Sequence, residues 1–475
     1  MRALPARLCA LQLALLGVAP AVFGAGAGIP DLGAAALGEA GANVARPSDL
    51  TALYYNPAAL TALPGLTVYL DGRAVGQKVY FQRLTAAGAN LRGWQPVENL
   101  GNPSVAPIFG ISYLFDRPGW VPVSLALGGF PQNGATGYRY NDPHDIRANG
   151  GTESDVAQRA SQRYLSIASS SKIYIPAAAI AAQLLPWLSL GAELQLPIAS
   201  FNTRQAVYAG LVSGEDTAFD ATIDVKGTDT FARSGLFGVS LTPLPWLSAG
   251  ASLQLQTHFR ARGTIEAQLP PSLDKLITVQ GDRIGVDVIF PWVARAGVRV
   301  TRGPFSVELA GTYERWSLLK QIRVDIIDVR FTLGNTSTAL PPIAVQKDFQ
   351  DAGSVRLGGE WKAGSLFSSL DFLTVRAGIL GESNAIPEQR QALDWAHWER
   401  LSVNFGLGAE LGRWTANFGI GHFLQADRQV RDSLVAQVAA LPGVTPTVVG
   451  NGNYGSDMTV VALGLSTHFD PQGRQ

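Results

Sequence analysis

Long segments of the chain alternate apolar and polar residues, which is the pattern of β-strands that have one apolar and one polar face. Segment 188–196 reads LSLGAELQL, and segment 247–255 reads LSAGASLQL. Many such runs reach about ten residues, whereas strands of soluble proteins average about five or six residues. The pattern predicts about fourteen strands, at residues 66–81, 103–115, 121–140, 162–184, 187–203, 229–242, 246–265, 284–301, 304–328, 351–363, 370–382, 398–411, 414–429 and 455–469.

The polar faces of these strands carry charged side chains, namely Arg295, Arg299, Glu308, Glu360 and Arg376. A soluble β-sandwich or propeller, whose strands also alternate, could not hold such charges unpaired in its dry core. The lumen of a membrane-spanning barrel is polar, and single-chain bacterial barrels have an even number of strands. The pattern therefore favours an all-β transmembrane barrel of about fourteen antiparallel strands, at residues 65–469.

The connections between the predicted strands fall into two lengths. Short turns are expected at 116–120, 185–188, 244–247 and 302–304, and long loops at 132–162, 206–227, 268–282, 333–348 and 430–453. Short turns at one end and long loops at the other are typical of outer-membrane barrels. The last predicted strand ends on Phe469, an aromatic ending similar to that of such barrels, and a tail of residues 470–475 follows.

The N-terminus has the layout of a secretory signal peptide, with Arg2 and Arg7 ahead of an apolar stretch and small residues after it. We expect cleavage after about residues 24–27, which defines a signal peptide at 1–27. Charged residues make up 16% of the chain, against roughly 25% for an average soluble domain. Lys plus Arg equals Asp plus Glu at 37 each, so no basic field attracts nucleic acid. After the signal peptide, no segment offers the 18 uninterrupted apolar residues of a typical membrane helix.

Segment 28–64, between the signal peptide and the first strand, is small and apolar and does not alternate. Its short helix-compatible pieces lie at 32–39 and 50–54. Side chains can fill a barrel of about eight strands, whereas sixteen to eighteen strands leave an aqueous channel. A barrel of fourteen strands lies between these sizes, so we expect this segment to form an N-terminal hatch, or plug, that blocks the lumen.

Several motifs occur in a fixed order along the chain. Asn56-Pro57-Ala58 precedes the first strand, and IFPWVARAGVRV (289–300), VELAGTYERWSLLKQIRV (307–324), SVRLGGEWKAG (354–364) and LTVRAGILGES (373–383) follow. In these motifs the chain resembles the FadL-type family of outer-membrane long-chain fatty acid transporters, which also includes transporters of aromatic hydrocarbons. The family usually has a Pro-Asp turn before its twelfth strand, whereas this chain has LDWAHWERLS (393–402).

The resemblance implies a fourteen-stranded barrel with a small hatch that contains the Asn-Pro-Ala motif. It also implies passive uptake of hydrophobic compounds such as long-chain fatty acids. A simple turn, with Asn ahead of Pro, is the structural alternative for Asn56-Pro57-Ala58. The same tripeptide occurs twice in aquaporins, but here it occurs once and without membrane helices.

In the resembled family a kinked third strand opens a lateral gap in the barrel wall beside the hatch. Here Gly128, Gly129 and Pro131 interrupt the third predicted strand around Phe130. Glycine gives a sheet no side chain to pack, and proline has no N–H to donate. We therefore expect lateral release at this break, with the Asn-Pro-Ala motif against it. A bulge at the barrel rim is the alternative.

Ligand capture is expected at the outer loops. After a pair of prolines, four apolar residues follow at roughly helical spacing, namely Leu269, Leu273, Leu276 and Ile277. They predict either a short amphipathic helix that offers an apolar groove or a loop that packs on its neighbours.

A carboxylate ligand would also need a cation in the lumen. The candidates are Arg295, Arg299 and Arg376, and the sequence does not distinguish among them.

The chain carries no G-x-S-x-G elbow, H-E-x-x-H helix, phosphate-binding loop or C-x-x-C pair, and its 5 histidines are scattered singly. We expect no enzyme activity, no cofactor and no metal. The expected partners are hydrophobic small molecules and outer-membrane lipid, without nucleic acid, and the expected state is a monomer. A general diffusion porin for polar solutes and a structural or adhesive barrel remain the alternative functions.

Overall fold

The computed structural model describes residues 24–25, 31–101, 103–132, 137–143, 152–210, 213–275, 277–333, 335–339, 342–437 and 445–469. The expected signal peptide, apart from residues 24–25, lies outside the described residues, as do residues 28–30 of the expected hatch and the tail 470–475. The cleavage site therefore stays a prediction.

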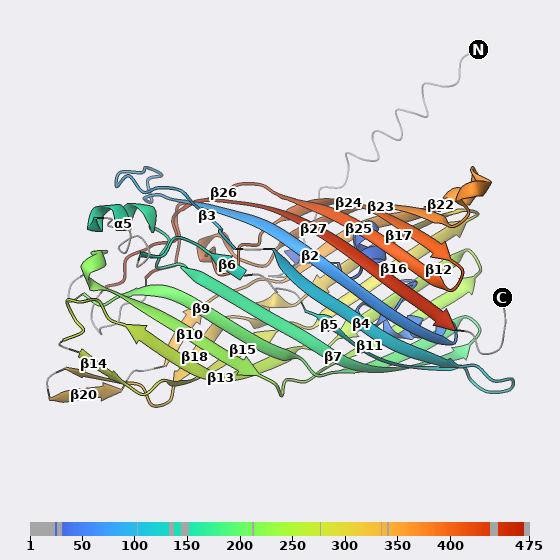
Figure 1. Cartoon of the computed structure of the whole chain (residues 1–475), viewed down its shortest axis with the longest axis horizontal. Helices are drawn as coiled ribbons and strands as arrows, with labels where there is room; N and C mark the ends of the chain where they lie inside the picture. The colour runs from blue at the N-terminus through green and yellow to red at the C-terminus, as the bar shows by residue number, and fades with distance from the viewer. Residues whose placement is uncertain are drawn as a thin grey trace, which may run out of the picture.

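The described strands form a closed antiparallel barrel (Figure 1). Its wall consists of fourteen segments, some of which contain two consecutive strands. In order around the wall the crossings are β2 (Leu66–Arg83); β4 (Ser104–Phe115); β5 (Val123–Pro131) with β6 (Gly137–Arg139); β7 (Ala168–Leu185); β8 (Leu188–Gln195) with β9 (Ile198–Tyr208); β10 (Asp220–Asp229) with β11 (Ser234–Leu244); β12 (Leu247–Gln254) with β13 (Thr257–Gln268); β15 (Arg283–Phe290) with β16 (Val293–Arg302); β17 (Phe305–Glu314) with β18 (Gln321–Ile326); β21 (Ile343–Gln346) with β22 (Ala352–Lys362); β23 (Leu373–Asn384); β24 (Arg400–Leu411); β25 (Trp414–Gln425) with β26 (Arg428–Val430); and β27 (Gly452–Phe469).

The first and last strands close the barrel, from Leu66 opposite Phe469 to Arg83 opposite Gly452. The strand β1 (Gly24–Ala25) pairs with the end of β23. The remaining smaller elements lie between the wall strands, namely β3 (Val97–Glu98), α5 (Glu153–Arg159), β14 (Ile277–Gln280), β19 (Arg330–Leu333), β20 (Thr336–Ala339), η2 (Thr217–Phe219), η3 (Trp316–Leu318), η4 (Ala363–Ser365), η5 (Ser368–Leu370) and η6 (Glu388–Arg390).

The alternating pattern sets the two faces of the wall as the sequence predicts. On β8, Ser189, Glu193 and Gln195 are buried inside the barrel, whereas Leu190 and Leu194 face outward and are exposed. Aromatic side chains lie near the short turns, namely Trp120, Trp187, Trp246, Phe305, Trp414 and Phe469. Other aromatic residues lie further along the strands toward the long loops, namely Phe231, Phe237, Trp292 and Tyr313. Aromatic residues that border an apolar band are typical of outer-membrane barrels. None of the described helices is long and apolar enough to cross a membrane.

The strands extend further toward the long loops than the sequence predicts. Residues 220–227, expected in a loop, belong to β10, and residues 343–346, also expected in a loop, form β21. On these strands the apolar residues, such as Ile223 and Val225, face the lumen and polar residues, such as Lys226, face outward, so the apolar outer face that marks the lower wall is absent. The predicted loops at 206–227 and 333–348 are wrong to that extent.

The segment Asp31–Leu63, called the N-terminal segment below, lies within the barrel near its short turns (blue in Figure 1). It contains α2 (Ala34–Gly38), α3 (Ala52–Tyr55) and the 3-10 helix η1 (Pro57–Ala62). Helix α2 contacts β24 and β25, whereas η1 contacts β7, β8 and β11 on another part of the wall. Most residues of the segment are buried.

Candidate functional site

Asn56 joins the N-terminal segment to the barrel wall. Its Oδ1 accepts the N–H of Ala58 at 3.1 Å, which caps η1, and Pro57 takes the first helical position. Its Nδ2 donates to the carbonyl of Val44 at 3.1 Å and to that of Val239 on β11 at 2.9 Å. The buried side-chain amide of Asn56 thus hydrogen-bonds to the first turn of η1, to another part of the N-terminal segment and to the barrel wall.

Two glycines of the wall allow this close approach. A Cβ at Gly191 on β8 would overlap the backbone of Pro57 and Ala58, and one at Gly238 on β11 would overlap the side chain of Asn56. The tripeptide therefore makes its closest contacts with β8 and β11. The 3-10 helix η1, which the tripeptide begins, also contacts β5 of the third strand, as does the preceding helix α3.

A buried network of five charged side chains also joins the segment to the wall. Glu39, directly after α2, pairs with Arg299 of β16. Arg299 also lies 3.0 Å from Glu308 of β17 and 3.4 Å from Glu360 of β22. Arg376 of β23 lies 3.5 Å from Glu39 and 3.5 Å from Glu360. Burial raises the pKa of Glu39 to about 7, against the attraction of Arg299. Two of the three predicted carboxylate partners, Arg299 and Arg376, are therefore occupied by the protein's own carboxylates.

Further polar contacts extend this interface. The backbone N–H groups of Val44 and Ala45 donate to Glu308 at 2.7 and 2.9 Å. Asp31 lies 3.5 Å from Arg356 of β22. Burial raises the pKa of Asp31, whereas Arg356 lowers it. Charges that the sequence predicts to face a wet lumen are thus covered by the N-terminal segment.

Arg295 of β16, the third predicted carboxylate partner, differs from the other two. It forms no ion pair with the described residues. Its Nη2 donates to Gln254 at 3.2 Å, and its Nη1 is buried without a partner among the described residues. The guanidinium lies 4.7 Å from the ring centroid of Tyr54, which in turn lies 5.8 Å from the ring of Phe130 on the third strand.

The ladder between β4 and β5 stops in the middle of the wall. The two strands pair from Phe115 opposite Val123 to Phe109 opposite Gly129. The same register would next bring Pro107 opposite Pro131, and neither proline has an N–H to donate. Beyond this point β4 still pairs with β2, and β5 still pairs with β7. Sequence reasoning identified Pro131 but missed Pro107, although a proline inside a predicted strand is a usable signal.

The third strand is also displaced against its other neighbour. Pro131 of β5 lies opposite Tyr174 of β7, and Gly137 of β6 lies opposite Ser170. The third strand therefore uses two more residues than β7 over this stretch. The predicted interruption coincides with this irregularity.

Side chains fill the break from the lumen side. Phe130 is 1% exposed and packs against Tyr54. An added Cβ at Gly128 would meet Leu53 of α3 at 2.6 Å, so the helix rests directly on this strand.

On the outer side, the ring of Tyr174 covers Gly129 and stacks on Phe109 of β4, with ring centroids 6.2 Å apart. Aromatic side chains thus lie on both faces of the break.

An apolar cavity of about 260 Å³ lies inside the barrel, toward the long loops. Its walls come from β7, β9, β10, β13, β15, β18 and β21, and most lining residues are Ile, Val, Ala or Phe. Phe259 and Phe290 meet edge to face in its wall, with centroids 5.2 Å apart. Ile173 also lines the cavity, and its carbonyl accepts the N–H of Gln132, directly after Pro131, at 2.9 Å. The cavity wall therefore meets the break in the third strand.

Among the described lining residues the cavity has a single cation, Lys347. Its Nζ lies 2.5 Å from Asp394 and 5.3 Å from the ring centroid of Trp395. Lys347 is 4% exposed and is therefore buried, whereas its counter-ion Asp394 is half-buried, with 30% of its side chain exposed. Sequence reasoning missed this pair because both partners lie outside the alternating segments.

The predicted capture loop is not an amphipathic helix. The backbone N–H of Ile277 donates a helix-like hydrogen bond to the carbonyl of Leu273 at 2.9 Å. Ile277 nevertheless begins β14, which pairs with β19. Leu269 and Leu273 are half-buried, and none of these three residues lines the cavity. Leu276 lies outside the described residues, and the capture role stays a prediction.

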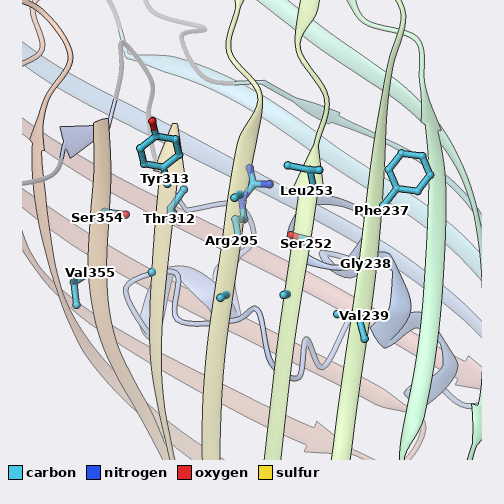
Figure 2. A pocket seen from close by; sticks show the side chains of 14 residues that line it. Phe237, Gly238, Val239, Ser252, Leu253, Arg295, Thr312, Tyr313, Ser354 and Val355 are labelled. Carbon is cyan, nitrogen blue, oxygen red and sulfur yellow. The ribbon is translucent and has the colours of Figure 1, made fainter. Parts of the chain in front are cut away.

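Figure 2 shows a second hollow, of about 800 Å³, over β11, β12, β16, β17 and β22. Phe237, Leu253 and Val355 on its border face outward and are 51%, 41% and 58% exposed. This hollow therefore belongs to the lipid-facing side of the wall, and the lumen cavity remains the candidate binding site. Within the described residues no group of three or more His, Cys, Asp or Glu side chains is placed to hold a metal.

Comparisons with known proteins agree with this architecture. A family model described as outer membrane protein transport protein (OMPP1/FadL/TodX) matches residues 15–467. A solved FadL homologue from Pseudomonas aeruginosa is 11% identical with a TM-score of 0.73, over 94% of this chain and 99% of that one. The toluene transporter TbuX of Ralstonia pickettii is 15% identical with a TM-score of 0.60, over 92% and 98%. TodX of Pseudomonas putida, also a toluene transporter, is 15% identical with a TM-score of 0.62, over 92% and 98%. No curated protein sequence matches the chain.

Proposed function

Because the chain belongs to the OMPP1/FadL/TodX family of outer membrane transport proteins, we propose that it admits hydrophobic compounds passively across the outer membrane. The observation that carries the proposal is an apolar lumen cavity whose wall meets a broken strand ladder. An apolar solute gains about 0.8 kcal/mol for each methylene that stays out of water. A sideways exit into the bilayer therefore suits it better than a water-filled pore.

The proposed route has three stages. The outer loops capture the solute, the lumen cavity holds it, and it leaves through the wall between Pro107 and Pro131. In the present arrangement Phe130 and Tyr54 block this exit from inside, so release requires their rings to move. The backbones of β4 and β5 are not paired at the break, since their ladder ends where Phe109 lies opposite Gly129.

The N-terminal segment acts as the hatch in this proposal. Its burial and its contacts with opposite parts of the wall support a role in blocking polar solutes. This role also argues against the alternative of a general diffusion porin, whose lumen must be open to water. Deleting residues 28–64 should then make cells permeable to polar solutes, and an equally tight membrane would contradict the assignment.

The exit is tested by restoring the missing donors with the double variant Pro107→Val, Pro131→Val. Uptake of toluene and of oleate is measured in a strain without other transporters of this family. We expect uptake to fall to the background of cells without the protein. The matched control is Pro243→Val on β11, an exposed proline of the wall far from the break. Unchanged uptake in the double variant would refute lateral release at this site, whereas no uptake by the native protein would refute the transport function itself.

The substrate class is narrowed by the cavity. Its volume of about 260 Å³ is below the roughly 300–1,000 Å³ of drug-sized pockets. Its cation, Lys347, is already neutralised by Asp394. Both observations favour small uncharged molecules, and the two toluene transporters named above carry such a ligand.

Long-chain fatty acids are the second candidate. Their carboxylate would have to replace Asp394 beside Lys347, or reach the unpaired Nη1 of Arg295. Competition between toluene and oleate for uptake distinguishes the two classes.

A further inference from the structure

Three exposed cations on the outer wall take no part in the transport route. Lys172 of β7, Lys226 of β10 and Arg262 of β13 are all exposed. Each sits at a position of its strand that faces away from the lumen, because the residues beside it, such as Ile173, Val225 and Ala261, line the cavity.

Lys226 and Arg262 lie on paired strands, and Lys172 lies one strand further along the wall, since β9 separates β7 from β10. Thr228 lies opposite Arg262, and Lys226 lies opposite Thr264, so Lys226 and Arg262 are diagonal neighbours. Diagonal partners in an antiparallel pair are about 7–8 Å apart, within reach of long side chains. Lys172 lies in the same row, since it faces Ser200 and Ser200 faces Thr228.

Two of the neighbouring acidic groups, Asp287 and Asp325, form ion pairs with other cations. Asp287 pairs with His258 at 3.3 Å and with Arg260 at 4.0 Å. Arg323 pairs with Asp325 at 2.6 Å.

Arg204 likewise pairs with Asp224 at 3.8 Å. Glu266 of β13 is the other diagonal neighbour of Lys226, on the side away from Arg262, and no ion pair joins the two among the described residues. Lys172, Lys226 and Arg262 therefore remain without carboxylate partners among the described residues, although like charges on adjacent strands repel each other.

The position of these cations relative to the membrane is defined by the wall below them. On β7 the outward residues Ile180, Ala178 and Tyr174 precede Lys172. On the strand that continues into β13 the outward apolar residues end at Leu255, seven residues before Arg262. Lys172 thus lies directly beyond the last outward aromatic side chain of its strand, and Arg262 lies further toward the long loops.

The opposite wall has no such excess. There Lys78 of β2 lies opposite Asp457 of β27, and His422 of β25 lies 3.9 Å from the same carboxylate. Lys78 therefore has an acidic residue directly opposite it, which Lys172, Lys226 and Arg262 do not.

We propose that Lys172, Lys226 and Arg262 form a docking site for the phosphate groups of lipid A in the outer leaflet. Lys and Arg bind phosphate through charge-assisted hydrogen bonds, and basic clusters beside an apolar membrane surface attract anionic headgroups. The site would fix lipid against the outer face of the cavity wall. It is independent of the substrate that the lumen carries.

The test compares the native protein with the triple variant Lys172→Gln, Lys226→Gln, Arg262→Gln. The full-length protein in detergent is titrated with bisphosphorylated lipid A, and bound lipid is measured by native mass spectrometry. We expect the affinity of the triple variant to fall at least about tenfold, given roughly 1 kcal/mol for each basic residue near a charged membrane surface. Dephosphorylated lipid A should bind the native protein and the triple variant equally.

The matched control removes three exposed cations elsewhere, with Lys78→Gln, Arg302→Gln, Lys362→Gln. Its affinity for bisphosphorylated lipid A should equal that of the native protein. Equal loss in both triple variants would reduce the effect to net charge and overturn the proposal. So would undiminished binding by the first variant, or full competition by inorganic phosphate at the same concentration as lipid A. Heat-modifiable migration in detergent gels confirms that each variant is folded.

Discussion

The inner face of the barrel has two regions that treat charge in opposite ways. Near the short turns it carries Arg299, Glu308, Glu360 and Arg376, all joined to Glu39 of the N-terminal segment or to one another. Toward the long loops it carries Ile, Val and Phe side chains around an apolar cavity, with a single neutralised lysine. The charged region is filled by the protein's own chain, and the apolar region is left open.

The difference follows from the cost of leaving each kind of surface unpaired. A buried charge requires a counter-ion and hydrogen bonds, so a charged inner wall needs a segment fixed over it that supplies them. An apolar wall imposes no such requirement and can accept an exchangeable ligand. The comparison predicts that variants in the charged region change sealing and stability, whereas variants in the cavity change ligand selection.

The largest effect is expected for Arg299→Met. It leaves Glu39 and Glu308 buried without their shared cation, and breaking a buried ion pair on one side costs about 3–5 kcal/mol. We expect the free energy of unfolding in lipid vesicles to fall by about that amount and cells to become permeable to polar antibiotics. Arg302→Gln, an exposed arginine on the same strand, serves as the control. An unchanged seal and stability would show that the network does not hold the segment.

The next effect is a pH dependence at Glu39. Its pKa rises from 4.5 in the unfolded chain to about 7 in the fold. Because the folded state retains the proton longer, this group stabilises the fold fully below about pH 4.5, and its contribution falls as the pH rises toward 7, by up to about 1.4 kcal/mol per pH unit.

Glu39→Gln should abolish this contribution. The unfolding free energy of the native protein minus that of the variant should therefore decrease as the pH rises from 4.5 to 7. A difference that is constant over this range would contradict the assignment.

A smaller effect is expected where the N-terminal segment approaches the wall. Gly238→Val places a side chain on Asn56, and overpacking of this kind costs about 1–3 kcal/mol. The matched control is Gly76→Val on β2, where an added Cβ meets nothing within 4 Å. Limited proteolysis should cut the N-terminal segment faster in Gly238→Val only. Equal rates in the two variants would refute the close contact.

The smallest effect concerns ligand selection in the cavity. Asp394→Asn removes the counter-ion of Lys347 and should raise the uptake of oleate relative to toluene about fivefold, which corresponds to about 1 kcal/mol. Lys347→Met should leave toluene uptake unchanged, and neither variant should alter permeability to polar solutes. Permeability to polar solutes in either variant would contradict the assignment of sealing to the charged region alone.

Sequence reasoning identified the barrel and the inward position of its charges because both depend on a period of two, which the chain displays directly. It also identified the interruption at Gly128, Gly129 and Pro131. It missed Pro107, because the break requires two prolines on neighbouring strands and the register between strands is a property of the closed sheet. It likewise missed the pair of Lys347 and Asp394, whose partners are far apart in the chain.

Two expectations about the loops were less accurate. The pattern predicts loops where β10 and β21 form, because strands above the lipid band lose the apolar outer face that marks the lower wall. The spacing of Leu273 and Ile277 permits either a helix or a packed loop, whereas pairing with β19 draws Ile277 into a strand. In both cases a nonlocal partner outweighed the local pattern.

By itself the sequence determined the class of this protein, since alternation and turn length are local features that the membrane environment imposes on each strand separately. Which charges are paired, where the ladder fails and where an apolar cavity remains were decided only by the tertiary structure. Closing the barrel sets the register that aligns Pro107 with Pro131. Packing the N-terminal segment and the segment before β24 against the wall brings Glu39 to Arg299 and Asp394 to Lys347.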